Sequence, residues 1–318
     1  MGSIETLEIL APGPLTTVQD LGRFGFGRYG VASSGALDSF SLRVGNLLVG
    51  NREDEACLEI TLFGLKLKTL TEAVITVTGA DMQPHLNGTP LVMWRSHVLK
   101  KGDTLFFKGL KSGCRAYLAL GGGISVPSVL RSKSTNLSTK FGGLKGRPLQ
   151  KGDLLPSDSP HAHLKAGGRC FDPKWIPSYP KHWVLKTVFG PQDDHFPEEA
   201  KSLFQKSSFN VTLHSDRTGI RLAGPAIQRK AGLAESIISE GMVSGAIQIP
   251  GDGQPIIILG ELVTGGYRKI ATVITADLPF LGQIKPGDRV KFKVVSLKEA
   301  YHAVKDADGM IRRFKKSG

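Results

Sequence analysis

The sequence predicts a mainly β protein built from two β domains with a few short helices. Short runs of apolar and β-branched residues are separated by turns that often contain glycine, a pattern typical of barrels and sandwiches. Glycine supplies 39 of the 318 residues, more than its usual share of about 7%, and has no three-residue period that would indicate collagen. Similar motifs also occur in the same order in both halves of the chain.

The expected strands are rich in Val, Ile, Leu, Phe and Thr, and each ends near a glycine, a proline or a polar turn. They cover residues 7–11, 58–62, 65–70, 73–78, 103–108, 115–120, 183–189, 209–213, 244–249, 255–259, 269–275 and 289–295.

Three segments carry a helical pattern instead. In residues 36–49 apolar side chains recur every three or four positions, and Gly50 supplies a stop. Residues 196–206 carry Pro197 and two glutamates near their start, which favour a helix N-terminus. Residues 298–306 form the third expected helix.

The two halves resemble distant copies of one another. Three motifs recur in order: LEILAPGP (7–14) with LKTVFGP (185–191), VQDLGRFG (18–25) with LHSDRTGIR (213–221), and KKGD (100–103) with KPGD (285–288). Collinear repeats indicate a duplication. A proline-rich segment without a period, residues 157–180, separates the halves. We therefore expect an N-terminal domain over residues 1–180 and a C-terminal domain over residues 181–318.

Composition narrows the class of protein. The chain has 41 Lys and Arg against 28 Asp and Glu, a formal charge of +13, but the basic residues are scattered apart from residues 312–316. We expect that run to be a solvated tail, and we expect no nucleic-acid partner. Three distant cysteines form no disulfide framework. No apolar run is long enough for a membrane span and no signal peptide is evident, so a cytoplasmic location without membrane contact is expected.

Familiar catalytic and metal motifs are absent from the sequence. It contains no Walker phosphate loop, no dinucleotide-binding glycine motif, no HExxH and no GxSxG. His161 and His163 form a potential metal pair, but no third ligand lies near them in the sequence. We therefore predict no metal site and assign no catalytic residue.

Two polar clusters in the first half are candidate binding sites. Asp20 and Arg23 are close enough for the carboxylate to orient the guanidinium as an anion clamp, although the same pair could simply close a turn. Ser34 and Asp38 belong to the segment that leads into the first expected helix, whose N-terminal amides could hold an anion. Capping of that helix by Ser34 is the alternative.

A run of three glycines, Gly121, Gly122 and Gly123, follows the expected strand of residues 115–120. Glycines allow the backbone to approach a ligand closely and to present N–H groups, as in an oxyanion hole or an anion nest. A tight turn without a ligand is the alternative.

Further candidates gather in the second half. A side chain that alternates with apolar neighbours along a strand points to the opposite face, so Gln248 points either into a barrel mouth or to solvent. The predicted ligand-contacting residues here are Asp216, Arg217, Arg221, Gln248, Gln254, Thr264, Gly265, Gly266 and Tyr267.

Many of these motifs, in this order, resemble one protein family. They include TVQDLGR (17–23), SGALD (34–38), NLLVGN (46–51), LEITL (58–62), YLALGGG (117–123), SKST (132–135), FGPQ (189–192), SDR (215–217), GAIQIP (245–250), GQP (253–255) and TGGY (264–267). The chain resembles the family of the 5-oxoprolinase C subunit, also called KipA or allophanate hydrolase subunit 2. It is also similar to part of the carboxyltransferase domain of urea carboxylase.

The resemblance implies a fold and a function. It implies two cyclophilin-like β-barrel domains and a complex with two further proteins, one KipI-like and one LamB/YcsF-like. That complex opens 5-oxoproline to glutamate with ATP, so a small amide or carboxylate substrate is expected, and this chain alone is expected to be inactive. Two alternatives are a KipA-like regulator that sequesters a KipI-like kinase inhibitor, and a carboxyltransferase that uses biotin.

The chain departs from the family pattern before the TGGY motif. Where the family has Asp-x-Gln-Thr, this chain has Gly260, Glu261, Leu262 and Val263. Glu261 would stand in for the missing carboxylate only if the strand shifted by one residue. Within the resemblance, Arg23 and Arg217 would hold anionic groups, oriented by Asp20 and Asp216, and the amides of the triple glycine would stabilise an oxyanion.

Overall fold

The computed structural model describes residues 2–317 and divides them into two compact units. The first unit contains residues 2–24, 34–179 and 311–317, and the second contains residues 25–33 and 180–310. The main change of unit thus follows Tyr179, at the end of the proline-rich segment. Two short segments depart from this division: residues 25–33 belong to the second unit, and residues 311–317 belong to the first. A single boundary in the sequence therefore does not separate the two units.

Two antiparallel sheets form the first unit. One has the strand order β11-β1-β4-β9-β6-β7 and the other the order β2-β3-β10-β5-β8. Their strands are β1 (Ile4–Pro12), β2 (Leu15–Gln19), β3 (Cys57–Thr61), β4 (Leu65–Thr69), β5 (Ala73–Asp81), β6 (Pro84–Leu86), β7 (Thr89–Pro90), β8 (Ser96–Leu99), β9 (Thr104–Phe107), β10 (Ser112–Leu120) and β11 (Leu154–Ser157).

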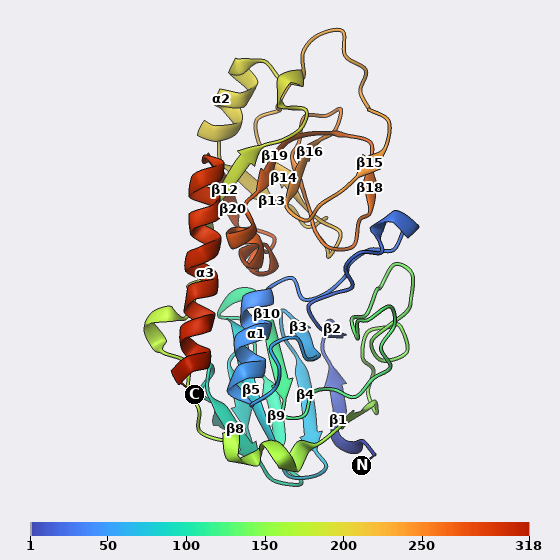
Figure 1. Ribbon diagram of the computed structural model, residues 1–318, viewed down its shortest axis with the longest axis vertical. Helices are drawn as coiled ribbons and strands as arrows, with labels where there is room; N and C mark the ends of the chain where they lie inside the picture. The colour runs from blue at the N-terminus through green and yellow to red at the C-terminus, as the bar shows by residue number, and fades with distance from the viewer. Residues whose placement is uncertain (1, 318) are drawn as a thin grey trace. The chain divides into compact units, whose positions relative to one another are not determined.

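Residue alternation decides which face of each sheet is buried. In β4 the side chains of Leu65, Leu67 and Thr69 are buried, whereas Lys66 and Lys68 are exposed. Strands from both sheets contribute to a single apolar core, so the sheets pack on one another. Most strands of the second sheet are buried on both faces because the helix α1 (Ser39–Leu48) covers its outer side, as Figure 1 shows in front of β10 and β5.

The proline-rich segment is an ordered part of the first unit, not a free linker. It contains the 3-10 turns η2 (Pro160–Ala166) and η3 (Pro173–Trp175). Phe171 is buried against Val44, Leu48 and Trp94. Apolar residues inside the segment therefore attach it to α1 and to the neighbouring sheet.

The second unit contains a closed barrel, with the order β12-β19-β16-β17-β14-β13-β20 (Figure 1). The parallel pairing of β12 with β20 closes it. Its strands are β12 (His182–Phe189), β13 (Phe209–Val211), β14 (Gly219–Ala223), β16 (Ala246–Ile249), β17 (Ile256–Ile258), β19 (Arg268–Val273) and β20 (Arg289–Val294). A separate ribbon pairs β15 (Glu240–Gly241) with β18 (Thr264–Gly265).

Aromatic side chains attach the helix α2 (Glu198–Lys206) to this barrel. The ring of Phe204 stacks on that of Phe292 with 4.4 Å between centroids, and Phe209 lies 5.8 Å from Phe292. The 3-10 turns η4 (Asp193–His195) and η5 (Thr275–Gln283) complete the second unit. A further 3-10 turn, η1 (Gly27–Tyr29), belongs to the short segment that groups with it.

The mainly β class is confirmed, with one difference in detail. The second unit is a closed barrel, whereas the strands of the first unit form two sheets. All three expected helices are present. The first begins at Ser39, later than expected, because Asp38 caps it by accepting a hydrogen bond from the Ser41 amide.

The C-terminal basic run is helical, so the expectation of a solvated tail is wrong. The helix α3 (Leu297–Ser317) extends well beyond the expected residues 298–306. Within the first unit, Phe314 meets the ring of Phe171 edge-on, with 5.1 Å between centroids, and Lys315 forms a 3.0 Å ion pair with Glu53. No helix within residues 2–317 combines the length and the hydropathy that a membrane span requires.

Candidate functional site

A cleft of about 870 Å³ opens beside the barrel strands of the second unit. Strands β14, β16 and β17 and the segments around them form its walls. Many of the predicted ligand-contacting residues line it together: Asp216, Arg221, Gln248, Gln254, Thr264, Gly265, Gly266 and Tyr267. The fold thus brings into one cleft residues that lie more than forty positions apart in the sequence.

Gln248 provides a fixed amide in this cleft. Its side chain is only 3% exposed, and its Nε2 donates to the carbonyl of Tyr267 at 3.2 Å and approaches Met242 Sδ at 3.6 Å. A Cβ atom at position 265 would lie 2.5 Å from this Nε2, so Gly265 makes room for the amide. Within residues 2–317 the Oε1 atom accepts no hydrogen bond. Of the two orientations left open by the sequence, the structure has the one that faces the cleft.

Charged side chains of both signs line the same cleft as Gln248. Arg221 is exposed, and its guanidinium forms no ion pair with any described residue. Asp216 caps a turn, because its Oδ1 accepts from the amides of Thr218 at 2.7 Å and Gly219 at 3.1 Å. The cleft therefore offers the guanidinium of Arg221 as a cation, and the oxygens of Asp216 and Gln248 as hydrogen-bond acceptors. These groups suit a ligand that carries both an anionic group and N–H donors.

Gln254 has a mainly structural role at the rim of the cleft. Its Oε1 accepts from the amide of Gly224 at 2.8 Å, and its Nε2 donates to the carbonyl of the same residue at 3.2 Å. The side chain of Gln254 thereby fixes the backbone of Gly224, the residue that follows β14.

Two acidic residues of the cleft escaped the sequence analysis. Glu235 lies in a long loop without periodicity, and its carboxylate rests against Gly251. Asp252 stands between two glycines and was not singled out, although the motif around it was. The pattern GDG was the only signal in the sequence that pointed to either of them.

Arg217 does not line the cleft, and its carboxylate partner is not Asp216. Its Nε lies 2.7 Å from Oε1 of Glu261, and the two side chains are 3% and 4% exposed. Glu261 directly follows Gly260, which stands where the family has its Asp, and it is the carboxylate of Glu261 that pairs with Arg217. The expected role of Asp216 in orienting Arg217 is corrected accordingly.

A second polar cluster of the second unit, centred on the buried Lys269, was not predicted. Lys269, 5% exposed, donates to Glu240 Oε1, and Gln192 Nε2 donates to the same oxygen at 2.7 Å. The Lys269 amide in turn donates to Gln192 Oε1 at 3.0 Å. The hydrogen bond from Lys269 lowers the pKa of the Glu240 carboxyl, which remains ionised near neutral pH.

In the first unit Asp20 organises a loop and does not orient Arg23. Its carboxylate accepts from the hydroxyls of Ser132 at 2.7 Å and Ser134 at 2.5 Å, and from the Lys133 amide. Arg23, 1% exposed, donates instead to the carbonyl of Ser134. Asp20 and Arg23 therefore form neither an anion clamp nor an ion pair that closes a turn. Each of them binds the same loop separately.

The guanidinium of Arg23 also lies over the ring of Phe141, 4.7 Å from its centroid. This contact and the bond to Ser134 thus attach Arg23 to two places in the same loop, residues 129–146.

The triple glycine is a packing feature, so its proposed role as an oxyanion hole is corrected. The amide of Gly121 donates to Val74, that of Gly122 to Asn51 Oδ1, and that of Gly123 to Leu120. All three amides are thus used inside the fold. A Cβ atom would lie 2.5 Å from Val74 Cγ1 at position 121, 2.5 Å from Ser157 Oγ at 122 and 2.8 Å from Glu55 Oε2 at 123. The glycines are needed for close approach, not for a ligand.

The amides before α1 are also used inside the fold. Leu37 donates to Glu59 Oε2 at 2.9 Å, and Asp38 donates to the hydroxyl of Tyr117 at 2.8 Å. Asp38 and not Ser34 caps α1, and the amides of Leu37 and Asp38 are not available to an anion. Burial raises the pKa of Tyr117, and the nearby Glu59 carboxylate raises it further, so the phenol stays protonated as the donor to Glu59.

The two histidines of the proline-rich segment make ordinary structural contacts. His161 Nε2 lies 3.0 Å from the hydroxyl of Thr71, and His163 Nδ1 lies 3.0 Å from the carbonyl of Val49. Among the residues that the structure describes, no group of three or more His, Cys, Asp or Glu side chains is arranged to hold a metal ion.

Comparison with known proteins gives the class to which this mainly β protein belongs. Residues 29–294 match the family described as "Carboxyltransferase domain, subdomain A and B", and the chain belongs to that family. It is 37% identical to the 5-oxoprolinase C subunit of Escherichia coli (strain K12) over 303 residues, which cover 94% of each protein. The resemblance drawn from the motifs is therefore confirmed.

Larger proteins contain a similar part. The urea amidolyase of Lachancea kluyveri is 36% identical over 323 residues, which cover 96% of this chain and 18% of that protein. The crystal structure of the Kluyveromyces lactis urea carboxylase superposes with a TM-score of 0.91 at 34% identity, over 99% of this chain and 29% of that chain. This chain thus spans under a third of these two proteins.

Proposed function

We propose that this protein is a subunit of an ATP-dependent 5-oxoprolinase that opens 5-oxoproline to glutamate. The observation that carries the proposal is the match along nearly the whole of both chains to a protein named as the C subunit of 5-oxoprolinase. The proposed partners are a KipI-like protein and a LamB/YcsF-like protein.

The cleft of the second unit suits this substrate. 5-Oxoproline carries a carboxylate, a ring N–H and a ring carbonyl. The available guanidinium of Arg221 would pair with the carboxylate, and Oε1 of Gln248 would accept the ring N–H. Because Gln248 is held by Tyr267, its acceptor is fixed before the ligand arrives, which reduces the entropic cost of binding.

Ring opening adds water across the amide C–N bond, and ATP would activate the amide. This chain has no Walker phosphate loop, so ATP would be bound by the complex and need not contact this chain. The cleft supplies binding groups, and we assign no catalytic residue to it. The chain by itself should therefore bind and orient the substrate without turning it over.

Reconstitution tests this proposal. The chain is purified alone and together with its candidate KipI-like and LamB/YcsF-like partners, and ATP-dependent formation of glutamate from 5-oxoproline is measured. We expect turnover only when all three proteins are present. Turnover by the chain alone would refute the need for partners, and no turnover by a stable three-protein complex would refute the substrate.

A carboxyltransferase role is the second candidate, favoured by the family match and by the superposition on urea carboxylase. In that case a biotin-bound carboxyl group, carried by another protein or domain, would be transferred to an amide. Carboxylation of urea by the complex in the presence of carboxylated biotin would support it. A stable complex with the KipI-like protein that shows neither activity would support the regulatory alternative.

A further inference from the structure

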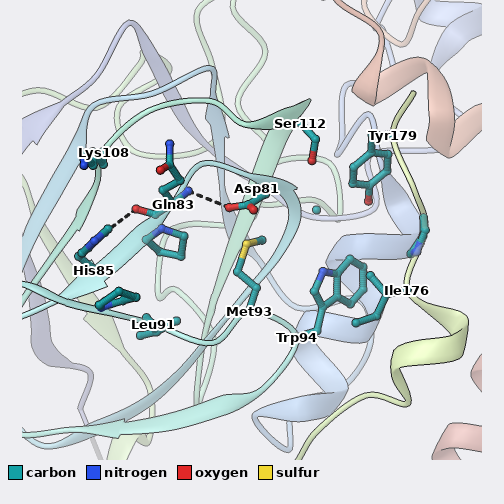
Figure 2. Close-up of a pocket in the computed structure, with 14 residues that line it drawn as sticks. Asp81, Gln83, His85, Leu91, Met93, Trp94, Lys108, Ser112, Ile176 and Tyr179 are labelled. Carbon is teal, nitrogen blue, oxygen red and sulfur yellow. Dashed lines mark hydrogen bonds between the residues drawn. The ribbon is translucent and has the colours of Figure 1, made fainter. Parts of the chain in front are cut away.

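The first unit contains a pocket of about 520 Å³ that shares no residue with the cleft of the second unit (Figure 2). Its apolar side is formed by Leu91, Met93, Trp94 and Ile176, and polar side chains stand around them. A mixed lining of this size is typical of small-molecule sites.

A local irregularity of the sheet creates the polar side of the pocket. Ser112 pairs with Asp81 across β10 and β5, and the register of these strands shifts between Ser112 and Ala116. At the shift Gly79 has a φ of +81°, and a Cβ atom there would lie 2.5 Å from the Arg115 carbonyl. The bulge therefore brings a hydroxyl and a carboxylate together at the end of two strands.

Trp94 supplies a hydrogen-bond donor to the pocket. The residue is 5% exposed and has a φ of +59°, a strained value for an aromatic residue. Its amide donates to Val77 of β5 at 2.8 Å, and its ring packs against Phe40 and Phe171. Among residues 2–317 the indole N–H has no hydrogen-bond partner, and Figure 2 shows the ring nitrogen on the side that holds Asp81 and Met93.

Asp81 supplies an acceptor beside this donor. Its Oδ1 accepts from the Gln83 amide at 2.9 Å, drawn as a dashed line in Figure 2. Its Oδ2 lies 3.3 Å from the ammonium group of Lys111. The hydroxyl of Ser112 has no partner among the described residues. Because the carboxylate already faces an ammonium group, a neutral donor suits the site better than a second cation.

We propose that this pocket binds neutral cyclic amides or cyclic ureas. The ligand carbonyl accepts from the indole N–H of Trp94 and the hydroxyl of Ser112. The ring N–H donates to the carboxylate of Asp81, and the carbon atoms of the ring lie on Leu91 and Met93. An amide edge carries an acceptor and a donor side by side, and this is the complement of the groups that the bulge brings together. The site is independent of the function proposed for the cleft.

Indole NMR signals test the proposal with 2-imidazolidinone as the probe. The chain has three tryptophans, so a ¹⁵N-labelled sample gives three indole signals, and Trp94→Phe identifies one of them. We expect only the Trp94 signal to shift and to saturate at millimolar probe. The Trp183 indole, bonded to Asp288 at 3.0 Å, is the internal control. No shift of the Trp94 signal, or equal shifts of all three signals, would overturn the proposal.

A matched ligand and matched variants separate specific from unspecific binding. 1,3-Dimethyl-2-imidazolidinone keeps the carbonyl but has no N–H, so it should bind about tenfold more weakly. Asp81→Asn and Ser112→Ala should each weaken 2-imidazolidinone by several-fold, whereas Trp175→Phe, outside the pocket, should leave it unchanged. Equal affinity of the two ligands, or an Asp81→Asn protein that binds like the wild type, would also overturn it.

Discussion

Arg217 and Glu261 form an ion pair that is almost closed to solvent. Nε of Arg217 lies 2.7 Å from Oε1 of Glu261, and the two side chains are 3% and 4% exposed. The residues lie 44 positions apart and belong to the same unit, so the pair ties together two turns beside the cleft. Removal of Glu261 would take this carboxylate away from a buried guanidinium, which is costly in a site closed to solvent.

Glu261→Ala should therefore lower the free energy of unfolding by about 3–5 kcal/mol. Urea denaturation followed by circular dichroism measures this loss. Replacement of both partners by apolar residues, Arg217→Met with Glu261→Leu, should cost less than Glu261→Ala alone, because no charge is left buried. A double variant whose loss equals the sum of the two single losses would contradict this account of the pair.

In contrast to Glu261→Ala, Arg221→Ala should leave stability almost unchanged and should weaken substrate binding. Its guanidinium is exposed in the cleft and pairs with no described residue, so folding should change by less than about 0.5 kcal/mol. A charge-assisted contact is worth roughly 1.5–3 kcal/mol, so KM for 5-oxoproline in the assembled complex should rise about ten- to a hundredfold. Arg217→Ala is the matched control, since it should reduce stability and leave KM of the folded protein level. The reverse pattern would place the anion contact at Arg217.

The sequence predicts the mainly β fold because strand and turn signals are local. Leu65, Leu67 and Thr69 alternate with exposed lysines, and that period alone places one face inward. The sequence also predicts part of the cleft. The family resemblance marks Gln248 and the TGGY segment as ligand-contacting residues, and the structure places them in one cleft. The partners of these side chains were not foreseeable.

Pairing across long sequence separations explains the errors. Asp20 and Arg23 lie close in sequence, yet both bind the loop around Ser134, more than a hundred residues away. The amides of the triple glycine were expected to be open, but they donate to Val74 of β5, to Asn51 and to Leu120 of β10. Local spacing shows which groups are present, whereas the tertiary fold decides which of them remain available for a ligand.

Asp20→Ala should loosen the loop of residues 129–146. Its carboxylate accepts four hydrogen bonds, from Gly22, Ser132, Lys133 and Ser134, so we expect a loss of about 3 kcal/mol or more in stability. Limited trypsin digestion should show faster cleavage inside the loop, where exposed basic side chains such as Arg131 lie.

Asp103→Ala is the control for this prediction. Asp103 also holds a turn of the first unit, by accepting from the Lys100 amide at 2.7 Å and from Asn87 Nδ2 at 2.8 Å, but it makes no contact with the loop. It should leave cleavage at residues 129–146 unchanged. Equal cleavage rates in the two variants would show that the loop does not depend on Asp20.

Asp153 should give the first unit part of its resistance to acid. Two hydrogen bonds of 2.8 Å from the guanidinium of Arg147 lower the pKa of its carboxyl, against the opposing effect of burial. A lowered pKa in the folded state means that the stabilisation is present above the unfolded value of about 3.9 and is lost as pH falls through the folded value. Asp153→Asn should therefore reduce stability at pH 7 and flatten its decline below about pH 4, as measured by urea denaturation at each pH.

Asp277 should contribute to the second unit with the opposite sign. Burial raises the pKa of its carboxyl, although Oδ2 accepts a 2.8 Å hydrogen bond from the Lys186 amide. A raised pKa in the folded state means that its contribution is present in full below about pH 3.9 and is lost as pH rises through the folded value. Asp277→Asn keeps an oxygen acceptor for the Lys186 amide and removes the buried charge. We expect it to raise the free energy of unfolding at pH 7 relative to the wild type and to change it little at pH 3. A variant that is destabilised at pH 7 by as much as Asp153→Asn would show that the ionised Asp277 carboxylate stabilises the barrel.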